Sequence, residues 1–308
     1  MGSVSIPAHT RRRAGRVAAG AVAAGAAAAA YMAYEAQWID CREADLVVPG
    51  LPAQWSGLRV LHLSDVHAGR FSLNDRSLAK VVSWAAPLPL DLVLLTGDIL
   101  GDPERSRPCL KLLSQLKPRL GLFAVTGNHE YGLGKGLLAR PRDTRPLWRE
   151  AGITLLSDSC AALPARAGCP LVLCGSDYLT GGYGLLEPGT VPASDSPAFP
   201  VLLAHKPPSS DSPLGRLFPL AFAGHTHGGQ LRAPGTAGLT PLHNEHEEHL
   251  AGVHRWGRGL MVVSRGVGVS FLPFRLLTRP EATLWRLVYT SASSAVVDHR
   301  TQTGGTHG

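Results

Sequence analysis

The sequence predicts an α/β sandwich, because short apolar runs alternate with segments of helical spacing. These runs are rich in Leu, Val and Ala, as expected of strands covered on both faces. Five of them lie at residues 58–63, 91–96, 120–125, 199–204 and 219–223. Each is followed within a few residues by Asp, Asn or His. Folds of this class place their chemistry at the carboxyl ends of strands, so the sequence predicts the position of the site as well as the architecture.

Composition indicates one large domain with additions at both ends. The chain has 308 residues, 44% of them hydrophobic, enough for the core of one sizeable domain. We assign the main domain to residues 57–290, after a basic segment at 1–38 and a linker at 39–56, and expect a disordered tail at 291–308. The formal net charge of +7 includes four arginines and one glutamate in residues 1–38. The remaining basic bias is weak, so no nucleic-acid binding is predicted.

The N-terminal segment has the composition of a membrane span or a signal peptide. Arginines at positions 11–13 and 16 precede the uncharged stretch 17–34. As a helix this stretch would reach about 27 Å, just enough to cross a hydrocarbon core. Arginines before it, with Glu35 and Asp40 after it, predict a cell-membrane protein with its N-terminus inside and its main domain outside the cytoplasm. A cleaved signal peptide, giving a secreted protein, fits the same pattern.

The other elements are expected in order along the main domain. Helical spacing at 73–86 places Leu78, Val81 and Val82 on one face. Weaker helices are expected at 108–116 and 146–151, and further strands at 171–174, 260–264 and 282–289. Loops are expected at 175–200, which is rich in Gly, Pro and Ser, and at 230–258, which is polar.

The five cysteines show no metal-binding spacing, because no two form a Cys-x-x-Cys pair. Cys160 and Cys169 could form a disulfide in an oxidising compartment. The odd number of cysteines, and the apolar run around Cys174, fit buried thiols equally well.

Candidate metal ligands follow the five apolar runs. They are, in chain order, Asp65, His67, Asp98, Asn128, His205, His225 and His227. In an extended backbone, residues two apart point to the same side. His225 and His227 can therefore leave the end of a buried strand toward one spot, as can Asp65 and His67. Two surface histidines would give the same local pattern, so the prediction depends on the repetition at five strand ends.

This set of side chains indicates two divalent ions. Oxygen and nitrogen ligands without thiolate suit manganese, iron, zinc or cobalt better than a structural zinc. Seven ligands are too many for one tetrahedral ion but adequate for two ions that share a carboxylate. Two ions about 3.5–4 Å apart can hold a bridging hydroxide and clamp the oxygens of a phosphoryl centre. The predicted substrate is therefore an anionic phosphate ester.

At these residues the sequence resembles the calcineurin-like metallophosphoesterases. The resemblance covers about residues 57–290 and implies a four-layer αββα sandwich of two mixed β-sheets. The matching motifs, in the family's order, are Asp65-Val66-His67, Gly97-Asp98, Gly127-Asn128-His129-Glu130, His205 and Gly224-His225-Thr226-His227. The N-terminal segment, Val263-Ser264-Arg265-Gly266 and Gly228-Gly229-Gln230 resemble the membrane-associated, YaeI/YkuE-like branch of that family.

The resemblance also implies a role for each ligand. One metal would be held by Asp65, His67, Asp98 and His227, and the other by Asp98, Asn128, His205 and His225. Asp98 would bridge the two ions, and His129 would act as general acid near the leaving oxygen. Arg70 and Arg265 could bind a substrate phosphate, although a surface position is the simpler interpretation of each. Protein phosphatases of the family carry an arginine after Gly-Asp, and residues 99–103 contain none.

We therefore expect a membrane-anchored phosphoesterase in which a metal-bridging hydroxide attacks phosphorus in line. A phosphodiester is favoured, and a lipid or nucleotide-linked lipid similar to UDP-2,3-diacylglucosamine fits because the anchor holds the site near a bilayer. Phosphomonoesters are the alternative substrates of the same centre. A catalytically silent surface protein that binds metal is the alternative from another class. No protein partner is expected.

Overall fold

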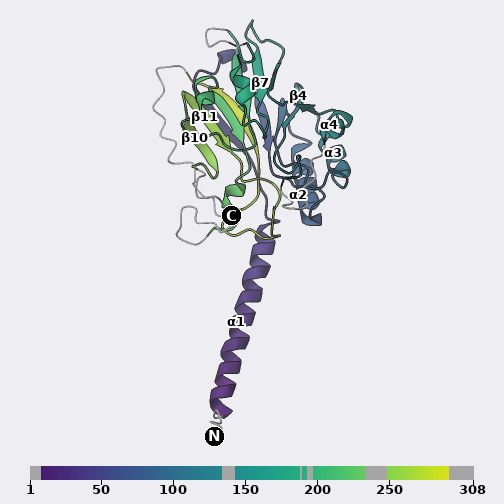
Figure 1. Ribbon diagram of the computed structural model, residues 1–308, viewed down its shortest axis with the longest axis vertical. Helices are drawn as coiled ribbons and strands as arrows, with labels where there is room; N and C mark the ends of the chain where they lie inside the picture. The colour runs from purple at the N-terminus through teal and green to yellow at the C-terminus, as the bar shows by residue number, and fades with distance from the viewer. Residues whose placement is uncertain (1–7, 134–142, 188, 193–196, 233–247, 291–308) are drawn as a thin grey trace.

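The computed structural model describes residues 8–133, 143–187, 189–192, 197–232 and 248–290. Within these residues two six-stranded sheets pack face to face, and one long helix projects from an end of the sandwich (Figure 1). Both sheets mix parallel and antiparallel pairs. The predicted sandwich of two mixed sheets is confirmed. The expected tail at 291–308 lies outside the described residues.

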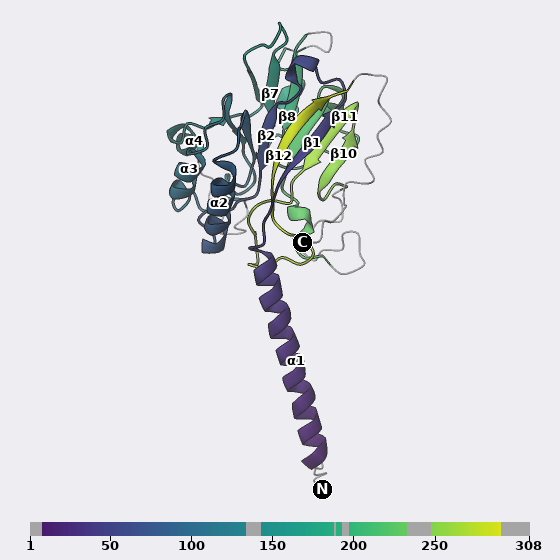
Figure 2. The ribbon, with the colours of Figure 1, turned by 180° about the vertical axis from the view of Figure 1, so that it is seen from behind.

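The first sheet carries the helical layer. Its strands, in order across the sheet, are β1 (Asp40–Val48), β12 (Glu281–Tyr289), β2 (Arg59–Leu63), β3 (Leu92–Thr96), β4 (Gly121–Val125) and β5 (Thr154–Leu155). Its outer face is covered by α2 (Ser72–Ala85), α3 (Arg107–Leu113) and α4 (Arg145–Glu150), which lie together on one flank in Figures 1 and 2. The predicted helical spacing is borne out at Leu78, Val81 and Val82, which are all buried against this sheet.

The second sheet is covered by shorter elements. Its strands, in order, are β10 (Gly252–Trp256), β11 (Gly259–Val263), β9 (Leu220–Ala223), β8 (Phe199–Leu203), β7 (Leu171–Gly175) and β6 (Ser159–Ala162). In the described residues its outer face packs against the 3-10 helices η3 (Tyr183–Leu186) and η4 (Pro213–Arg216) through Leu185 and Leu214. The fourth layer of the sandwich is therefore built here from short turns of helix.

Alternation along each strand explains the apolar runs. In β3, Leu94 joins the cluster between the sheets, whereas its neighbours Val93 and Leu95 join the cluster under the helices. Successive side chains of a strand point to opposite faces, so a strand covered on both sides must be apolar at every position. Each buried leucine contributes about 1.5–3 kcal/mol relative to an exposed one, and the strands that carry the site are held from both faces.

The prediction of a linker at 39–56 is wrong for most of that range. Residues 40–48 form β1, which pairs in parallel with β12 over nine residues, and η1 (Ala53–Trp55) buries Trp55 completely. The strand was missed because it lies at the sheet edge and is rich in charged residues, from Asp40 to Asp45. β10, likewise an edge strand, occupies part of the polar stretch expected as a loop at 230–258.

The disulfide also differs from the expected pair. Cys160 of β6 bonds to Cys174 of β7, its cross-strand neighbour in the register. Cys169 is a buried free thiol, as is Cys109. Position in the sheet, and not distance along the chain, selects the partner.

The topology places the carboxyl ends of the central strands beside the long helix. This helix, α1 (Ala8–Glu35), is followed at once by β1. β1 and β12 run parallel, with Asp40 opposite Glu281, whereas β2 runs antiparallel to β12. The carboxyl end of β2 therefore returns to the level at which β1 begins. The predicted site lies at the end of the domain from which α1 projects (Figure 1).

Candidate metal centre

The seven predicted ligands come from the carboxyl ends of five strands in two sheets. Asp65 and His67 follow β2, Asp98 follows β3 and Asn128 follows β4 in the first sheet. The second sheet supplies His205 after β8, with His225 and His227 after β9. The side chains at 65, 67, 98, 205 and 227 are buried, and those of Asn128 and His225 are half-buried.

One group of ligand atoms gathers around His67 and His227. Their Nε2 atoms face each other at 3.0 Å, and His227 Nε2 lies 3.4 Å from Asp65 Oδ1. His67 Nε2 is 3.7 Å from Asp98 Oδ2. The ligand atoms of Asp65, His67 and His227 all lie within 4.8 Å of one another. Such converging nitrogen and carboxylate atoms suit a divalent cation.

A second group gathers on the other side of Asp98. His205 Nε2 lies 3.4 Å from Asp98 Oδ2 and 3.1 Å from His225 Nδ1. Asp98 thus stands between the two groups, as the bridging role requires. Asn128 Oδ1 and Asp65 Oδ1 are buried without a hydrogen-bond partner in the described part of the chain. Buried oxygens without partners are costly, and a bound cation would satisfy both.

The ligands do not converge by the extended geometry that the sequence suggested. Positive φ angles occur at Asp65 (51°), His67 (49°), Asp98 (52°), His225 (71°) and His227 (50°). After His225 the chain turns directly into the 3-10 helix η5 (His227–Gly229). Left-handed backbone at residues other than glycine costs about 1–3 kcal/mol each and tends to cluster at functional sites. Tight left-handed turns at the strand ends, and not strand alternation, aim these side chains.

Comparison with known proteins places the chain in a family. The family model described as calcineurin-like phosphoesterase matches residues 58–229, which contain every predicted ligand. The chain belongs to this family. The resemblance read from the motifs is confirmed, and the protein is a metal-dependent phosphoesterase.

Several relatives of this phosphoesterase are similar over most of the chain. Phosphodiesterase YaeI of Escherichia coli is 31% identical, over 75% of this chain and 82% of its own length. The uncharacterized metallophosphoesterase YkuE of Bacillus subtilis is 28% identical, over 83% of this chain and 88% of its own. A transmembrane protein with a metallophosphoesterase domain from Danio rerio is 30% identical, over 78% of this chain and 55% of its own. These relatives confirm the predicted branch of the phosphoesterase family.

Hydrogen bonds determine which carboxylate oxygen of Asp98, and which of Asp65, faces the candidate metal centre. Asp98 Oδ1 accepts from the backbone N–H of His129 at 2.8 Å, which leaves Oδ2 toward the imidazoles. Asp65 Oδ2 accepts from Ser64 Oγ at 2.6 Å and from the N–H of His225 at 2.9 Å. Oδ1 is therefore the oxygen of Asp65 that faces the imidazoles. The ligand oxygens are therefore oriented before any ion binds.

Two glycines let the backbone approach these carboxylates. A Cβ at Gly127 would lie 2.2 Å from Asp98 Oδ1, and a Cβ at Gly224 would lie 1.8 Å from Ser64 Oγ and 2.5 Å from Asp65 Oδ2. Neither position admits a larger residue without movement of a ligand. Steric contact with Asp98 thus explains why residue 127 is a glycine, and contact with Ser64 and Asp65 explains the glycine at 224.

Burial and charge set the protonation of the ligands. Burial lowers the pKa of His67 and of His227 well below the ordinary value, so both imidazoles are neutral and have a lone pair to offer. Burial acts to raise the pKa of Asp98, but the neighbouring His205 lowers it by more. The pKa of Asp98 therefore lies well below its ordinary value. The carboxyl group of Asp98 is therefore an anion. Burial acts to lower the pKa of His205, and Asp98 raises it to about 10.

Glu130 braces the loops after β3 and β4, a role that the sequence did not reveal. Its carboxylate is fully buried and accepts from the N–H groups of Asp98, Leu100 and Gly127 at 2.8–2.9 Å. Burial, followed by the charge of Asp98, raises the pKa of Glu130 to about 7. One side chain thus holds the backbone on both sides of the bridging ligand.

Arg275 is a second functional residue that sequence reasoning missed. It is fully buried, and its Nη1 donates to the carbonyl oxygen of His227 at 3.2 Å. Its Nη2 lies 3.4 Å from His227 Nδ1 and donates to the carbonyl oxygen of Arg265 at 2.8 Å. Burial lowers the pKa of Arg275 to about 9, so the side chain remains a cation at neutral pH. Through Nη1 it holds the backbone of His227 in place.

The two arginines predicted to bind substrate have different surroundings. Arg70 Nη1 lies 3.5 Å from His129 Nδ1, at the edge of the metal centre. Arg265 instead forms ion pairs with Glu281 and Asp40, each at 2.7 Å. These pairs occupy its guanidinium group, so we retain only Arg70 as a candidate for substrate binding.

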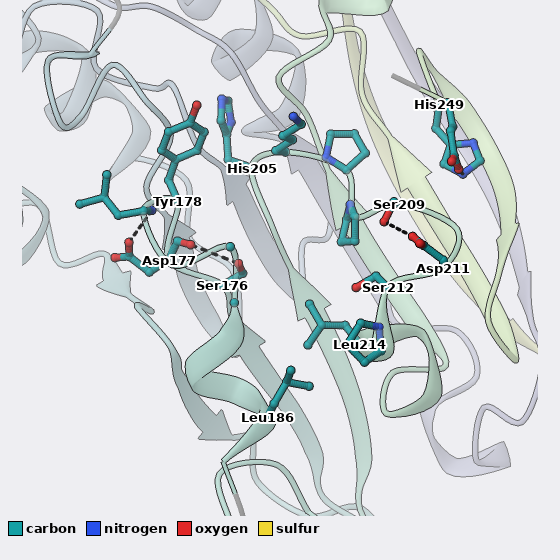
Figure 3. A pocket seen from close by; sticks show the side chains of 18 residues that line it. Ser176, Asp177, Tyr178, Leu186, His205, Ser209, Asp211, Ser212, Leu214 and His249 are labelled. Carbon is teal, nitrogen blue, oxygen red and sulfur yellow. Dashed lines mark hydrogen bonds and ion pairs between the residues drawn. The ribbon is translucent and has the colours of Figure 1, made fainter. Parts of the chain in front are cut away.

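A pocket of about 680 Å³ adjoins the candidate metal centre at His205. It is bounded by the loops after β7 and β8, and its lining includes Tyr178, Lys206 and His249. Figure 3 shows Tyr178 beside His205, with His249 across the pocket in that view. The pocket therefore opens next to the second group of ligands.

Proposed function

We propose that this protein is a membrane-anchored phosphodiesterase that uses two divalent metal ions. The observation that carries the proposal is the position of Asp98. Its Oδ2 lies 3.4 Å from His205 Nε2 and 3.7 Å from His67 Nε2, between the two groups of predicted ligands. A catalytically silent relative would be expected to lack ligands, whereas here each of the six predicted ligands other than Asn128 lies within 3.7 Å of another.

The residues present fit two ions of the manganese, iron, zinc or cobalt type. One ion would be held by Asp65, His67, Asp98 and His227, and the other by Asp98, Asn128, His205 and His225. Bound there, the ions would supply Lewis acidity toward a phosphoryl oxygen and lower the pKa of water. The two anionic carboxylates offset only part of four positive charges, so the loaded centre attracts an anionic ester.

His129 is placed to donate the proton that the leaving oxygen needs. Its Nε2 lies 3.8 Å from Asp98 Oδ2, so the ring faces the centre. A guanidinium group only donates, so the contact of Arg70 with Nδ1 makes Nδ1 the acceptor and keeps the proton on Nε2. His129 then acts as general acid, and Arg70 both sets its tautomer and offers a positive charge to the phosphate.

The pocket beside His205 supports a diester substrate. A phosphomonoester has a single organic group, whereas a diester must place a second one on the enzyme. The pocket is large enough for such a group, and Lys206 in its lining adds a positive charge. YaeI, which is named a phosphodiesterase, is 31% identical to this chain.

Three observations support a domain that is anchored and lies outside the cytoplasm. The described part of α1 includes a 21-residue candidate span, Gly15–Glu35, and basic residues precede it. The Cys160–Cys174 disulfide is typical of oxidising compartments. Glu35 is buried, and its Oε1 accepts from the N–H of Thr278 at 2.7 Å. Cleavage before the domain would remove this contact, which favours an anchor over a signal peptide. A lipid or nucleotide-linked lipid would then be within reach of the site.

The test is hydrolysis measured together with metal content. Purified full-length protein, loaded with manganese, is expected to bind two equivalents of metal. It should also hydrolyse bis-p-nitrophenyl phosphate faster than p-nitrophenyl phosphate. A preference for the monoester would support the phosphomonoesterase instead. Two bound equivalents without hydrolysis of any ester in a broad panel would support a silent metal-binding protein.

A further inference from the structure

Exposed apolar side chains gather where α1 meets the domain. They lie in the loop between β11 and β12, residues 264–280, and in the last turns of α1 and the residues just after it. Their exposed fractions are 60% for Tyr34, 45% for Trp38, 57% for Phe271, 42% for Leu272 and 52% for Leu277. We call these five residues the apolar rim. Scattered exposed apolar residues are ordinary, but a group of them beside a membrane span is not.

The β11–β12 loop is fastened to the end of the span. The backbone N–H of Arg275 donates to the carbonyl oxygen of Met32 at 3.0 Å, and that of Thr278 donates to Glu35 Oε1 at 2.7 Å. Arg279 Nε donates to the carbonyl oxygen of Trp38, and its guanidinium carbon lies 4.0 Å from the centre of the Trp38 ring. Contacts from three residues of this loop thus hold it against α1 and the segment that follows α1.

These contacts set the depth of the rim. Met32 and Glu35 belong to the last turn of the candidate span Gly15–Glu35. Any residue that is hydrogen-bonded to that turn lies at the level of the membrane interface when α1 spans the bilayer. Leu277, between two such residues, must then lie at that level. Aromatic residues at this level, such as Tyr34 and Trp38, are typical of the belt that flanks membrane spans.

The backbone of Leu277 supports this placement. Its φ angle is 54°, in the left-handed region that favours glycine or asparagine. A half-exposed leucine there carries a conformational cost, and an aqueous surface would not offset it. Contact with the acyl chains would offset it, because burial of a leucine contributes about 1.5–3 kcal/mol.

The same loop also contacts the metal centre. Arg275 Nη1 donates to the carbonyl oxygen of His227 at 3.2 Å, and the Phe271 ring lies 5.7 Å from the guanidinium carbon of Arg70. Gln230 Nε2 donates to the carbonyl oxygen of Leu272 at 3.0 Å. Figures 1 and 2 both show α1 leaving the domain at the end that carries these loops. One short segment therefore joins the site to the rim.

We propose that the apolar rim is seated in the outer surface of the bilayer that α1 spans, and that the substrate is a phosphate ester whose hydrocarbon part remains in that bilayer. The statement about substrate rests on the proposed function, whereas the statement about the rim does not. In this arrangement the ester approaches the metal centre past Arg70 and Phe271 without leaving the membrane.

The position of the rim can be measured by fluorescence. The full chain carrying Leu277→Cys, labelled with an environment-sensitive nitrobenzoxadiazole dye, is reconstituted in phosphatidylcholine vesicles with brominated acyl chains. The control is Tyr289→Cys, which is 43% exposed at the far end of β12, about 26 Å from the start of that strand at 3.3 Å per residue. Wild-type protein gives the background from Cys41, Cys109 and Cys169.

Quenching and a blue shift are expected at position 277 and not at position 289. Equal, water-like emission at both positions would overturn the proposal. Aspartate is tolerated in left-handed backbone, so Leu277→Asp should fold and should lose the membrane contact. Its kcat/KM for a fluorogenic phosphodiester lipid in vesicles should fall about tenfold relative to its kcat/KM for bis-p-nitrophenyl phosphate. Tyr289→Asp should leave that ratio unchanged.

The two proposals fail in different ways. If Leu277→Asp changed both substrates equally, a substrate held in the bilayer would be rejected even if the rim were seated there. If wild-type protein hydrolysed no phosphate ester, the proposed function would fail, and the fluorescence result would still decide the position of the rim.

Discussion

The two sheets contribute different chemistry to one centre. Of the seven candidate ligands, the first sheet carries both carboxylates, the amide of Asn128 and one imidazole, that of His67. The second sheet supplies only imidazoles, from the ends of β8 and β9. Even so, the N–H of His225 in the second sheet holds Asp65 of the first at 2.9 Å. The negative charge thus belongs to one sheet, and the centre is complete only when the other is packed against it.

Removing the bridging charge should have the largest effect. In Asp98→Asn both groups of ligands lose their common anion, so kcat/KM for bis-p-nitrophenyl phosphate should fall at least 10²–10³-fold, the scale of losing one electrostatic contribution. His225→Asn should weaken one metal ion only. Metal analysis after dialysis distinguishes the two variants, because Asp98→Asn should retain less metal. Equal metal loss from both variants would contradict the difference between the sheets.

Replacement of Arg275 tests whether metal binding by the second sheet depends on the residue that contacts His227. Arg275→Gln removes the hydrogen bond that holds the backbone of His227, and loss of such support typically weakens metal affinity about 10–100-fold. The matched control is Arg265→Gln, whose ion pairs with Glu281 and Asp40 lie one step further from the centre. Titration with manganese, with circular dichroism to confirm folding, should separate the two. Equal affinity in the two variants would show that Arg275 has only a structural role.

A methyl group at position 127 should displace the carboxylate of Asp98, a candidate ligand from the first sheet. In Gly127→Ala the new Cβ meets Asp98 Oδ1, so we expect about 1–3 kcal/mol of destabilisation together with weaker metal binding. Gly175→Ala is the matched control, because its Cβ would lie 2.3 Å from the Cβ of Leu156, away from any ligand. That variant should lose stability and keep its metal affinity. Urea unfolding and metal titration of both proteins provide the measurement.

Replacement of His62, which binds no metal in our proposal, should have the smallest effect on activity. It is buried in β2, its Nε2 lies 2.9 Å from Thr96 Oγ1, and burial lowers its pKa from 6.5 to about 3. Below pH 6.5 the unfolded chain therefore binds a proton that the folded chain refuses until about pH 3. Stability should fall with falling pH across that window, by at most about 1.4 kcal/mol per pH unit from this residue.

Comparison of wild-type protein with His62→Gln isolates this contribution. Urea unfolding in detergent at pH 6.5, 5.5 and 4.5 should show a shallower loss of stability in the variant. Parallel pH profiles would mean that His62 is protonated in the folded protein, contrary to its burial.

The buried strands could be predicted because their environment is uniform along the chain. β3 and β8 are covered on both faces, so their composition identifies them without knowledge of their neighbours. β1 could not be found in this way. It is an edge strand with charges from Asp40 to Asp45, and its place in the sheet depends on pairing with β12, more than 230 residues away.

The ligands could be predicted because each follows directly on such a strand. The reason given for their convergence was wrong, because left-handed turns at Asp65 and His227 depend on contacts that the local sequence does not show. Arg275 was missed for a related reason. It lies 48 residues from His227, in a loop without a recognisable pattern. Local patterns reveal which groups are available, and only the fold reveals what supports them.

The docked end of α1 has a consequence for how the enzyme would find its substrate. Because Met32 and Glu35 are hydrogen-bonded to the β11–β12 loop, an α1 that spans the bilayer would hold the proposed catalytic centre at a nearly constant height above the lipid headgroups. Encounters would then occur by lateral diffusion within a plane. The turnover rate would follow the number of ester molecules per unit area of membrane, and dilution of the surrounding solution would leave it unchanged.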